Sequence, residues 1–237
     1  MRIALLSDVH GNLVGLRAVA AALERDGPLD RVVVAGDHLL GGPRPRETWQ
    51  TLLATGWTLL RGNEDERLVA EHADDVPNPG DPHYRRALSA SHAWARAAVD
   101  PAILRALAAL PPAYRLTTPA GDLLVVHATP HSCHDRAGTP ATSLADLATM
   151  YRGTGAAAIA FGHYHQSFVR PTSFALLVNV ASVGLPKDQQ PLAAYTILTA
   201  GADGWVVEQR RVPYDAAEEA AAAEAAGLPA WTPDPLL

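Results

Sequence analysis

The chain has very little cysteine and no long apolar run. Its 237 residues include a single cysteine, Cys133, so no internal disulfide can form. This excludes a disulfide-stapled scaffold and is typical of a reducing compartment such as the cytoplasm. No apolar stretch approaches the roughly 20 residues that span a bilayer. The apolar run at 3–6 is also too short for a signal peptide. We therefore expect a cytoplasmic protein that does not enter a membrane.

Positive charge is also sparse. Lys187 is the only lysine among 19 basic residues, which stand against 25 acidic residues for a formal net charge of −6. Neutralising many phosphates requires a clustered positive face, and the sequence contains no run of Lys or Arg. We therefore expect no stable binding of duplex nucleic acid. Hydrophobic residues make up 48% and charged residues 19%, which is ordinary globular composition.

Strand and helix patterns alternate in the first part of the chain. Short apolar runs at 3–6, 31–35 and 57–60 predict buried strands. Helical spacing of apolar residues predicts helices between them, at 13–25 and 47–55. This β-α-β-α-β order is typical of a parallel sheet with crossover helices.

The rest of the chain is richer in strands. Helices are predicted at 65–73, 83–110, 143–151 and 215–226. Strands are predicted at 113–118, 123–127, 157–161, 167–170, 174–180, 193–199 and 205–211. We expect an α/β fold, a four-layer αββα sandwich of two mixed β-sheets flanked by helices. Residues 1–211 are expected to form one domain, with the Ala-rich helix and tail of 212–237 packed on it and its last residues, 229–237, frayed.

Polar residues gather where the predicted strands end. These strand ends read Ser7-Asp8-Val9-His10-Gly11-Asn12, Gly36-Asp37, Gly62-Asn63-Glu64-Asp65, Val126-His127 and Gly162-His163-Tyr164-His165. In open α/β sheets, ligands bind at the carboxyl ends of strands. Members of the Asp-x-His and His-x-His pairs are two residues apart, so both can point into one cavity. The glycine that precedes Asp37, Asn63 and His163 predicts a sharp turn that aims each side chain outward.

The residue types in these strand ends predict a metal site. They combine carboxylate, amide and imidazole ligands and contain no thiolate. Such mixed oxygen and nitrogen sites suit Mn, Fe, Co, Ni or Zn better than Ca or a structural zinc. Any one of these residues alone has an ordinary structural interpretation, such as a helix cap for Asp37 or a turn residue for Asn63.

The order D-x-H, G-D, G-N-x-D, H and G-H-x-H resembles the calcineurin-like metallophosphoesterase family over residues 1–211. Two further segments, GGP at 41–43 and NVASVGLPK at 179–187, resemble its small, uncapped bacterial phosphodiesterase-like branch. The resemblance implies a dinuclear-metal-dependent phosphoesterase in which a metal-bridging hydroxide attacks phosphorus. One ion would be held by Asp8, His10, Asp37 and His165, and the other by Asp37, Asn63, His127 and His163, with Asp37 bridging.

The same resemblance implies the cofactors and the residue roles. Two divalent transition-metal ions are expected per chain, manganese first, with iron, nickel, cobalt and zinc as alternatives. The catalytic set would be Asp8, His10, Asp37, Asn63 and His127. Substrate binding would involve Asn12, Asn63 and His131. Asn12 is included because N–H groups at the start of a helix favour anions.

One position departs from the family pattern. Many members carry a histidine, interpreted as the acid that protonates the leaving group, where this chain has Glu64. Two nearby cations would lower the pKa of a carboxyl group there. We therefore do not expect Glu64 to be an effective general acid and predict a phosphodiesterase. A phosphomonoesterase and a dinucleoside-polyphosphate hydrolase remain open, and a non-catalytic scaffold is disfavoured because every expected ligand position is filled.

The remaining histidines and two loops carry weaker expectations. His38 would either orient Asp37 or be exposed, and His131 and His134 would either face the substrate or serve only their loop. Solvated surface positions are expected for His72, His83 and His92. Specificity is expected to lie in the loops 77–82 and 128–140. The expected partner is a small phosphoester, with a nucleotide as one candidate, and a homo-oligomer stays open.

Overall fold

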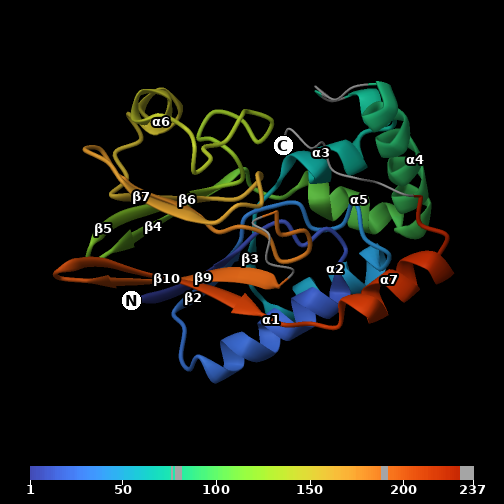
Figure 1. Ribbon diagram of the computed structural model, residues 1–237, viewed down its shortest axis with the longest axis horizontal. Helices are drawn as coiled ribbons and strands as arrows, with labels where there is room; N and C mark the ends of the chain where they lie inside the picture. Colours follow the sequence, from blue (N-terminus) through green and yellow to red (C-terminus); the bar gives the residue numbers. More distant parts are fainter. Residues whose placement is uncertain (76, 78–81, 188–191, 230–237) are drawn as a thin grey trace.

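The computed structural model of the protein describes residues 1–75, 77, 82–187 and 192–229. Two five-stranded sheets lie face to face, and helices cover their outer faces (Figure 1). The expected four-layer α/β fold is confirmed. Most of the expected specificity loop 77–82 lies outside the described residues, as does all but the first residue of the tail 229–237.

The first sheet contains the N-terminal strands and the last two strands of the chain. Its order is β10-β9-β1-β2-β3, with β1, β2 and β3 parallel, β9 antiparallel to β1, and β10 antiparallel to β9. The strands are β1 (Arg2–Leu6), β2 (Arg31–Val34), β3 (Thr58–Leu59), β9 (Ala193–Gly201) and β10 (Gly204–Val212). The carboxyl ends of β1, β2 and β3 therefore lie at one edge of the sheet.

The second sheet has the order β4-β5-β6-β8-β7, with β5, β6 and β8 parallel. Antiparallel strands β4 and β7 form its two edges. Its strands are β4 (Ala113–Thr118), β5 (Gly121–Val126), β6 (Ala158–Phe161), β7 (Phe168–Pro171) and β8 (Leu176–Asn179).

Three apolar layers hold the sandwich together. The middle layer lies between the sheets and joins Ile3 and Leu5 of β1 to Leu123 and Val125 of β5. Because side chains alternate along a strand, Leu6 of β1 points to the opposite face and packs beneath the helices. The near-continuous apolar strand runs in the sequence are explained by burial on both faces.

Helices lie on the outer face of each sheet. Helix α6 (Leu144–Tyr151) covers the second sheet, and α1 (Leu13–Arg25) covers the first (Figure 1). The others are α2 (Pro45–Thr55), α3 (Asn63–Val69), α4 (Pro82–Ala98), α5 (Pro101–Ala108) and α7 (Ala216–Ala225), with a 3-10 turn, η1, at Ala73–Asp75. Helix α7 lies against α1. No helix in the described part of the chain is both long and apolar enough to cross a membrane.

The single helix expected at 83–110 is wrong, because the chain divides it into α4 and α5. Asp100 has φ −78° and ψ 153°, an extended conformation. The ring of the following Pro101 disfavours the helical conformation at the preceding residue and removes one N–H donor. The expected helix at 65–73 also differs, since α3 begins at Asn63 and ends at Val69. Asn63 thereby stands at the first turn of a helix.

Candidate metal centre

The polar strand ends of the two sheets meet at one place in the molecule. Asp8 and His10 follow β1, Asp37 follows β2, His127 follows β5, and His163 and His165 follow β6, while Asn63 opens α3. All seven side chains are buried, none more than 8% exposed. The backbone N–H of His163, from the second sheet, donates to Asp8 Oδ2 of the first at 3.0 Å. This hydrogen bond ties the two sheets together at the site.

The backbone is strained at five of these positions. Six non-glycine residues in the described part of the chain have a positive φ, and all but Ala181 belong to this cluster: Asp8, His10, Asp37, His163 and His165. Their φ values lie between 51° and 70°. A left-handed conformation is costly for a residue with a Cβ and persists where the surrounding structure enforces it. Such strain is characteristic of functional sites.

The glycines that precede Asp37, Asn63 and His163 do not all form the sharp turns that we expected. Gly36 does have a positive φ of 98°, as a turn residue. Gly62, however, is extended, with φ −102° and ψ 177°. It and Gly162 are required by space, because a Cβ at Gly62 would meet the Asp37 carboxylate and a Cβ at Gly162 would meet that of Asp8. The left-handed turns lie on the candidate ligands themselves.

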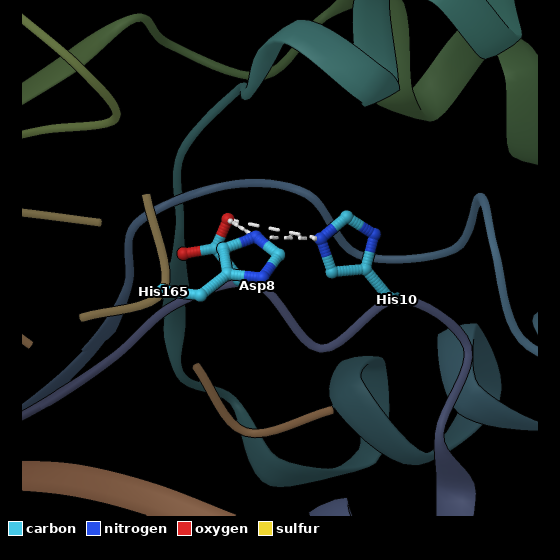
Figure 2. A group of neighbouring side chains, drawn as sticks. All are labelled: Asp8, His10 and His165. Atoms are coloured by element: carbon cyan, nitrogen blue, oxygen red, sulfur yellow. Dashed lines mark hydrogen bonds and ion pairs between the residues drawn. The ribbon is translucent and has the colours of Figure 1, made fainter. Parts of the chain in front are cut away.

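Asp8, His10 and His165 form the first cluster, called here the Asp8 group (Figure 2). His165 Nε2 lies 3.2 Å from Asp8 Oδ1 and 3.2 Å from His10 Nε2. His10 Nε2 is 3.8 Å from the same carboxylate oxygen. Three potential ligand atoms from two strands therefore converge on one point.

Hydrogen bonds to the backbone define the tautomers of these two histidines. His10 Nδ1 lies 2.7 Å from Leu40 O, and His165 Nδ1 lies 2.7 Å from Leu185 O. A carbonyl oxygen only accepts, so each Nδ1 is the donor and each neutral ring has its lone pair on Nε2. Two such acceptors face each other beside Asp8 Oδ1, which has no hydrogen-bond partner in the described part of the chain. A buried carboxylate oxygen without a hydrogen-bond donor is costly unless a cation satisfies it.

The second cluster, called here the Asp37 group, contains Asp37, His127 and His163. His127 Nδ1 donates to Ala35 O at 2.7 Å, which directs Nε2 inward. That Nε2 is 3.4 Å from Asp37 Oδ2 and 3.2 Å from His163 Nδ1. Asn63 joins this group, because its Oδ1 lies 2.8 Å from the same nitrogen.

Asp37 stands between the two groups. Its Oδ2 is 3.4 Å from His127 Nε2 and 3.9 Å from His10 Nε2, so one carboxylate oxygen faces a histidine of each group. Ligand atoms about 2.1 Å from one ion, at angles of about 90–110°, lie roughly 3.0–3.4 Å apart. Most separations within each group match this spacing. The residues present thus fit two metal ions that share Asp37.

The buried carboxylates of the metal-free site favour a positive charge beside them. Burial by itself would lower the pKa of His127, but the charge of Asp37 and their hydrogen bond raise it to about 10. Burial and repulsion by His127 instead lower the pKa of His163 to about 3. Burial would raise the pKa of Asp8, yet the attraction of His165 holds it well below its usual value. Without a metal, a proton on His127 supplies the missing cation.

We expect metal binding to release that proton. A histidine must be deprotonated to bind a metal, and His127 in the metal-free chain keeps its proton up to a pH of about 10. The apparent affinity of the Asp37 group should therefore rise about tenfold per pH unit from roughly pH 7 to 9. Calorimetric Mn²⁺ titrations in buffers of different ionisation enthalpy measure this release. An affinity independent of pH over that range would contradict the proton exchange.

Asp65, to which the sequence assigned no role, holds the loop that carries Asp37. Its carboxylate accepts from the backbone N–H of Asp37, His38 and Gly62, at 2.9, 2.9 and 2.8 Å. His38 is fully buried, and its Nδ1 lies 2.8 Å from the same carboxylate. His38 thus acts on Asp37 through Asp65 and the loop. Asp65 is the aspartate of the G-N-x-D motif, and this motif was the sequence signal that could have indicated its role.

Glu64 is engaged in a buried ion pair. Glu64 is 4% exposed and Arg67 is 2% exposed. Their side chains form an ion pair across one turn of α3. The other contact of Glu64 Oε1 is Asn63 Nδ2, at 2.8 Å. Arg67 in turn donates to Pro77 O at 2.6 Å. Glu64 therefore orients Asn63, so that the amide oxygen of Asn63 faces His127.

The other predicted residues lie outside the two groups. Asn12 caps α1, accepting from Gly15 N at 2.8 Å and donating to Gly184 O at 3.2 Å. His131 is exposed, whereas His134 pairs with Glu66 at 2.8 Å. The expectation of a solvated His92 is wrong, because its Nε2 contacts Arg67 O at 2.9 Å in a buried position. Packing of α4 against α3 buries it, which local polarity did not indicate.

Comparison with known proteins identifies similar folds. A model of the calcineurin-like phosphoesterase superfamily domain matches residues 1–203. A metallophosphoesterase structure from Sphaerobacter thermophilus is 27% identical, covers 97% of this chain and 95% of its own, and has a TM-score of 0.74. A hypothetical protein from Pyrococcus horikoshii OT3 is 20% identical, with coverages of 96% and 94% and a TM-score of 0.81. No curated protein sequence matches the chain.

Proposed function

The chain belongs to the calcineurin-like phosphoesterase superfamily, and from this membership we propose that it is a two-metal phosphodiesterase. The observation that supports the proposal most strongly is the position of Asp37. One of its carboxylate oxygens lies 3.4 Å from a histidine of the Asp37 group and 3.9 Å from one of the Asp8 group. A shared carboxylate offsets the repulsion between two adjacent divalent ions.

The residues of each group are suited to hold one divalent transition-metal ion. Asp8, His10 and His165 would hold the first, and His127, His163 and Asn63 the second, with Asp37 common to both. When bound, two such ions supply Lewis acidity toward phosphate oxygens and hydroxide at neutral pH. Nitrogen and oxygen ligands without thiolate favour Mn, with Fe, Co, Ni or Zn as alternatives.

The protein residues contribute preorganisation. The carbonyls of Leu40, Leu185 and Ala35 fix the rings of His10, His165 and His127 with Nε2 directed inward. Asp37 is oriented by the backbone N–H of Glu64, which donates to its Oδ1 at 2.8 Å. Such hydrogen bonds outside the ligand set fix ring orientation and increase ligand basicity. The groups that surround the reacting phosphate are thus held in place before substrate arrives.

The proposal of a diester substrate, rather than a monoester, follows from the contacts of Glu64. The side chain of Glu64 is held by Arg67 and Asn63, so it is engaged within the protein rather than positioned as an acid for a departing alkoxide. Substrates with good leaving groups should depend least on such an acid. The proposed substrate is a small phosphodiester, and the cytoplasm is the proposed compartment.

We expect the metal-loaded protein to hydrolyse bis(4-nitrophenyl) phosphate at least as well as 4-nitrophenyl phosphate, comparing kcat/KM. Without a general acid at position 64, rates on methyl aryl phosphates should rise steeply as the pKa of the leaving phenol falls. A panel of Mn, Fe, Co, Ni and Zn against these substrates measures both effects. Monoester turnover exceeding diester turnover tenfold would favour the phosphomonoesterase alternative. Absence of turnover with every metal would favour a non-catalytic scaffold.

A further inference from the structure

A third cluster of side chains that can bind a metal lies apart from the Asp8 and Asp37 groups. Glu66, Cys133 and His134 each offer one ligand atom, and these three atoms lie within 4.8 Å of one another. Glu66 belongs to α3, whereas Cys133 and His134 lie in the loop 128–140 that follows β5. We call these residues the Cys133 group. It contains the only cysteine of the chain, so it differs in donor chemistry from the other two groups.

The carboxylate of Glu66 is held from two sides. Its Oε1 lies 2.9 Å from Arg61 Nε, and its Oε2 lies 2.8 Å from His134 Nε2. A carboxylate only accepts, so His134 Nε2 carries the hydrogen in this contact. The Glu66 and His134 side chains are 30% and 13% exposed. The pair is therefore partly shielded from water, yet an ion can reach it from solvent.

Hydrogen bonds within the loop hold the turn that carries Cys133 and His134. Thr129 Oγ1 donates to Asp135 Oδ2 at 2.5 Å, and the backbone N–H of Thr129 donates to Ser132 O at 3.3 Å. The backbone N–H of His134 donates to Ser132 Oγ at 3.0 Å. A loop that is already ordered pays less entropy when it binds a ligand. The two neighbouring side chains are thus placed beside Glu66 before any ion arrives.

The Cys133 thiol stands close to negative charge. Burial raises the pKa of Cys133, and the charges of Glu66 and Asp37 raise it further, against a smaller lowering by Arg61. The thiol is therefore protonated in the metal-free chain. A bound metal ion reverses this, because a coordinating thiol loses its proton. The same surroundings that disfavour a lone thiolate stabilise a cation placed between thiolate and carboxylate.

The three donor types determine which ions fit. Thiolate and imidazole favour Zn²⁺ and similar ions, whereas Mn²⁺ and Mg²⁺ prefer oxygen ligands. Around a tetrahedral Zn²⁺, with Zn–N of about 2.0–2.1 Å and Zn–S of about 2.3 Å, ligand atoms lie roughly 3.3–3.6 Å apart. His134 Nε2 and Glu66 Oε2 are 2.8 Å apart, and the ligand atom of Cys133 lies within 4.8 Å of both residues. Small side-chain rotations bring these atoms to the spacing of one ion.

We propose that Glu66, Cys133 and His134 form a third metal site, selective for a thiophilic divalent ion of the Zn²⁺ class, with water as its fourth ligand. The proposal goes beyond the phosphodiesterase function and does not depend on it. When the ion binds, the Cys133 S–H bond breaks and the proton goes to solvent. The ion also replaces the hydrogen on His134 Nε2, and the bound tautomer carries it on Nδ1. The ion thereby ties the loop after His127 to the helix that begins with Asn63.

Cobalt spectroscopy on the full-length protein tests the site. A thiolate bound to Co²⁺ gives a sulfur-to-metal charge-transfer band in the near ultraviolet, which nitrogen and oxygen ligands do not give. Because Cys133 is the only cysteine, the band reports on this site even when Co²⁺ also fills the other two groups. We expect the band in the wild-type protein, and we expect excess Zn²⁺, but not excess Mn²⁺, to abolish it. No band at excess Co²⁺ would overturn the proposal.

Two variants separate a three-residue site from binding by the cysteine alone. His134→Ala and Glu66→Gln both keep Cys133, and each should weaken Co²⁺ binding, followed by the band, at least about tenfold, since even residues outside a ligand set affect affinity by that much. His72→Ala, an exposed histidine outside all three groups, is the matched control and should keep the wild-type affinity. Unchanged affinity in folded His134→Ala and Glu66→Gln would show that Cys133 binds alone and would overturn the site.

Metal content gives a second measurement that leaves Glu66 and His134 in place. After reconstitution with Zn²⁺ and gel filtration, Cys133→Ser should retain one ion fewer per chain than the wild-type protein. After reconstitution with Mn²⁺, the two proteins should retain the same number, because oxygen and nitrogen ligands alone hold Mn²⁺ here. Equal Zn²⁺ content in the two proteins would contradict the third site. None of these measurements uses turnover, so the site and the proposed function stand or fall separately.

Discussion

Asp37→Ala is expected to lower kcat/KM for bis(4-nitrophenyl) phosphate by about a thousandfold or more, and by more than Asp8→Ala does. The reason is geometric. Asp37 Oδ2 faces His127 of one group and His10 of the other, whereas both histidines near Asp8 Oδ1, His10 and His165, belong to the Asp8 group. Losing Asp37 would remove a proposed ligand of both ions, so metal content should fall together with activity.

Metal content by elemental analysis and steady-state kinetics check this expectation, with two ions per chain in the wild-type protein. Asp203→Asn, an exposed carboxylate in the turn between β9 and β10, is the control and should retain both metals and activity. The sheets should remain folded in Asp37→Ala, because their core is apolar and the site lies at strand ends. Equal and mild losses in Asp37→Ala and Asp8→Ala would argue against a shared carboxylate.

Glu64→Gln should destabilise the protein by about 3–5 kcal/mol, the usual cost of removing one partner of a buried ion pair. The cost arises because Arg67, 2% exposed, keeps its charge without a counter-ion. Burial lowers the pKa of Arg67 and the charge of Glu64 raises it in the wild-type protein. In the variant the raising effect is lost, but a guanidinium is so basic that it stays protonated. Urea unfolding of the metal-free variants measures the free energy.

The double variant Glu64→Gln/Arg67→Met provides the comparison. Removing both charges should recover most of the lost stability, since no buried charge is then left unpaired. The recovered protein should still bind metal less tightly in the Asp37 group, because Asn63 loses the carboxylate that accepts from its amide. Additive losses in the two single variants and the double variant would show that Glu64 and Arg67 do not act as a pair.

Two features that the sequence-based expectations missed have a local signal in the sequence. The break between α4 and α5 was readable from Asp100-Pro101, since proline restricts the residue before it. The Glu64–Arg67 pair has helical i, i+3 spacing, which favours a contact. Its burial was not readable, because Pro77 and the helices around α3 enclose it. His92 was misjudged for the same reason, as its partners lie 22 and 25 residues away.

By itself, the sequence determined the αββα fold and the set of polar residues that end its strands. Both depend on contiguous patterns: apolar runs stop at Asp8, Asp37 and His163, and parallel strands bring such ends to one edge. Only the tertiary structure decided how those side chains are used. His127 takes its tautomer from a carbonyl 92 residues away, and His10 from one 30 residues away. His134 likewise meets Glu66 from a distant segment of the chain. Hydrogen-bond partners, burial and ligand groups are set by contacts between distant segments, and no local pattern encodes them.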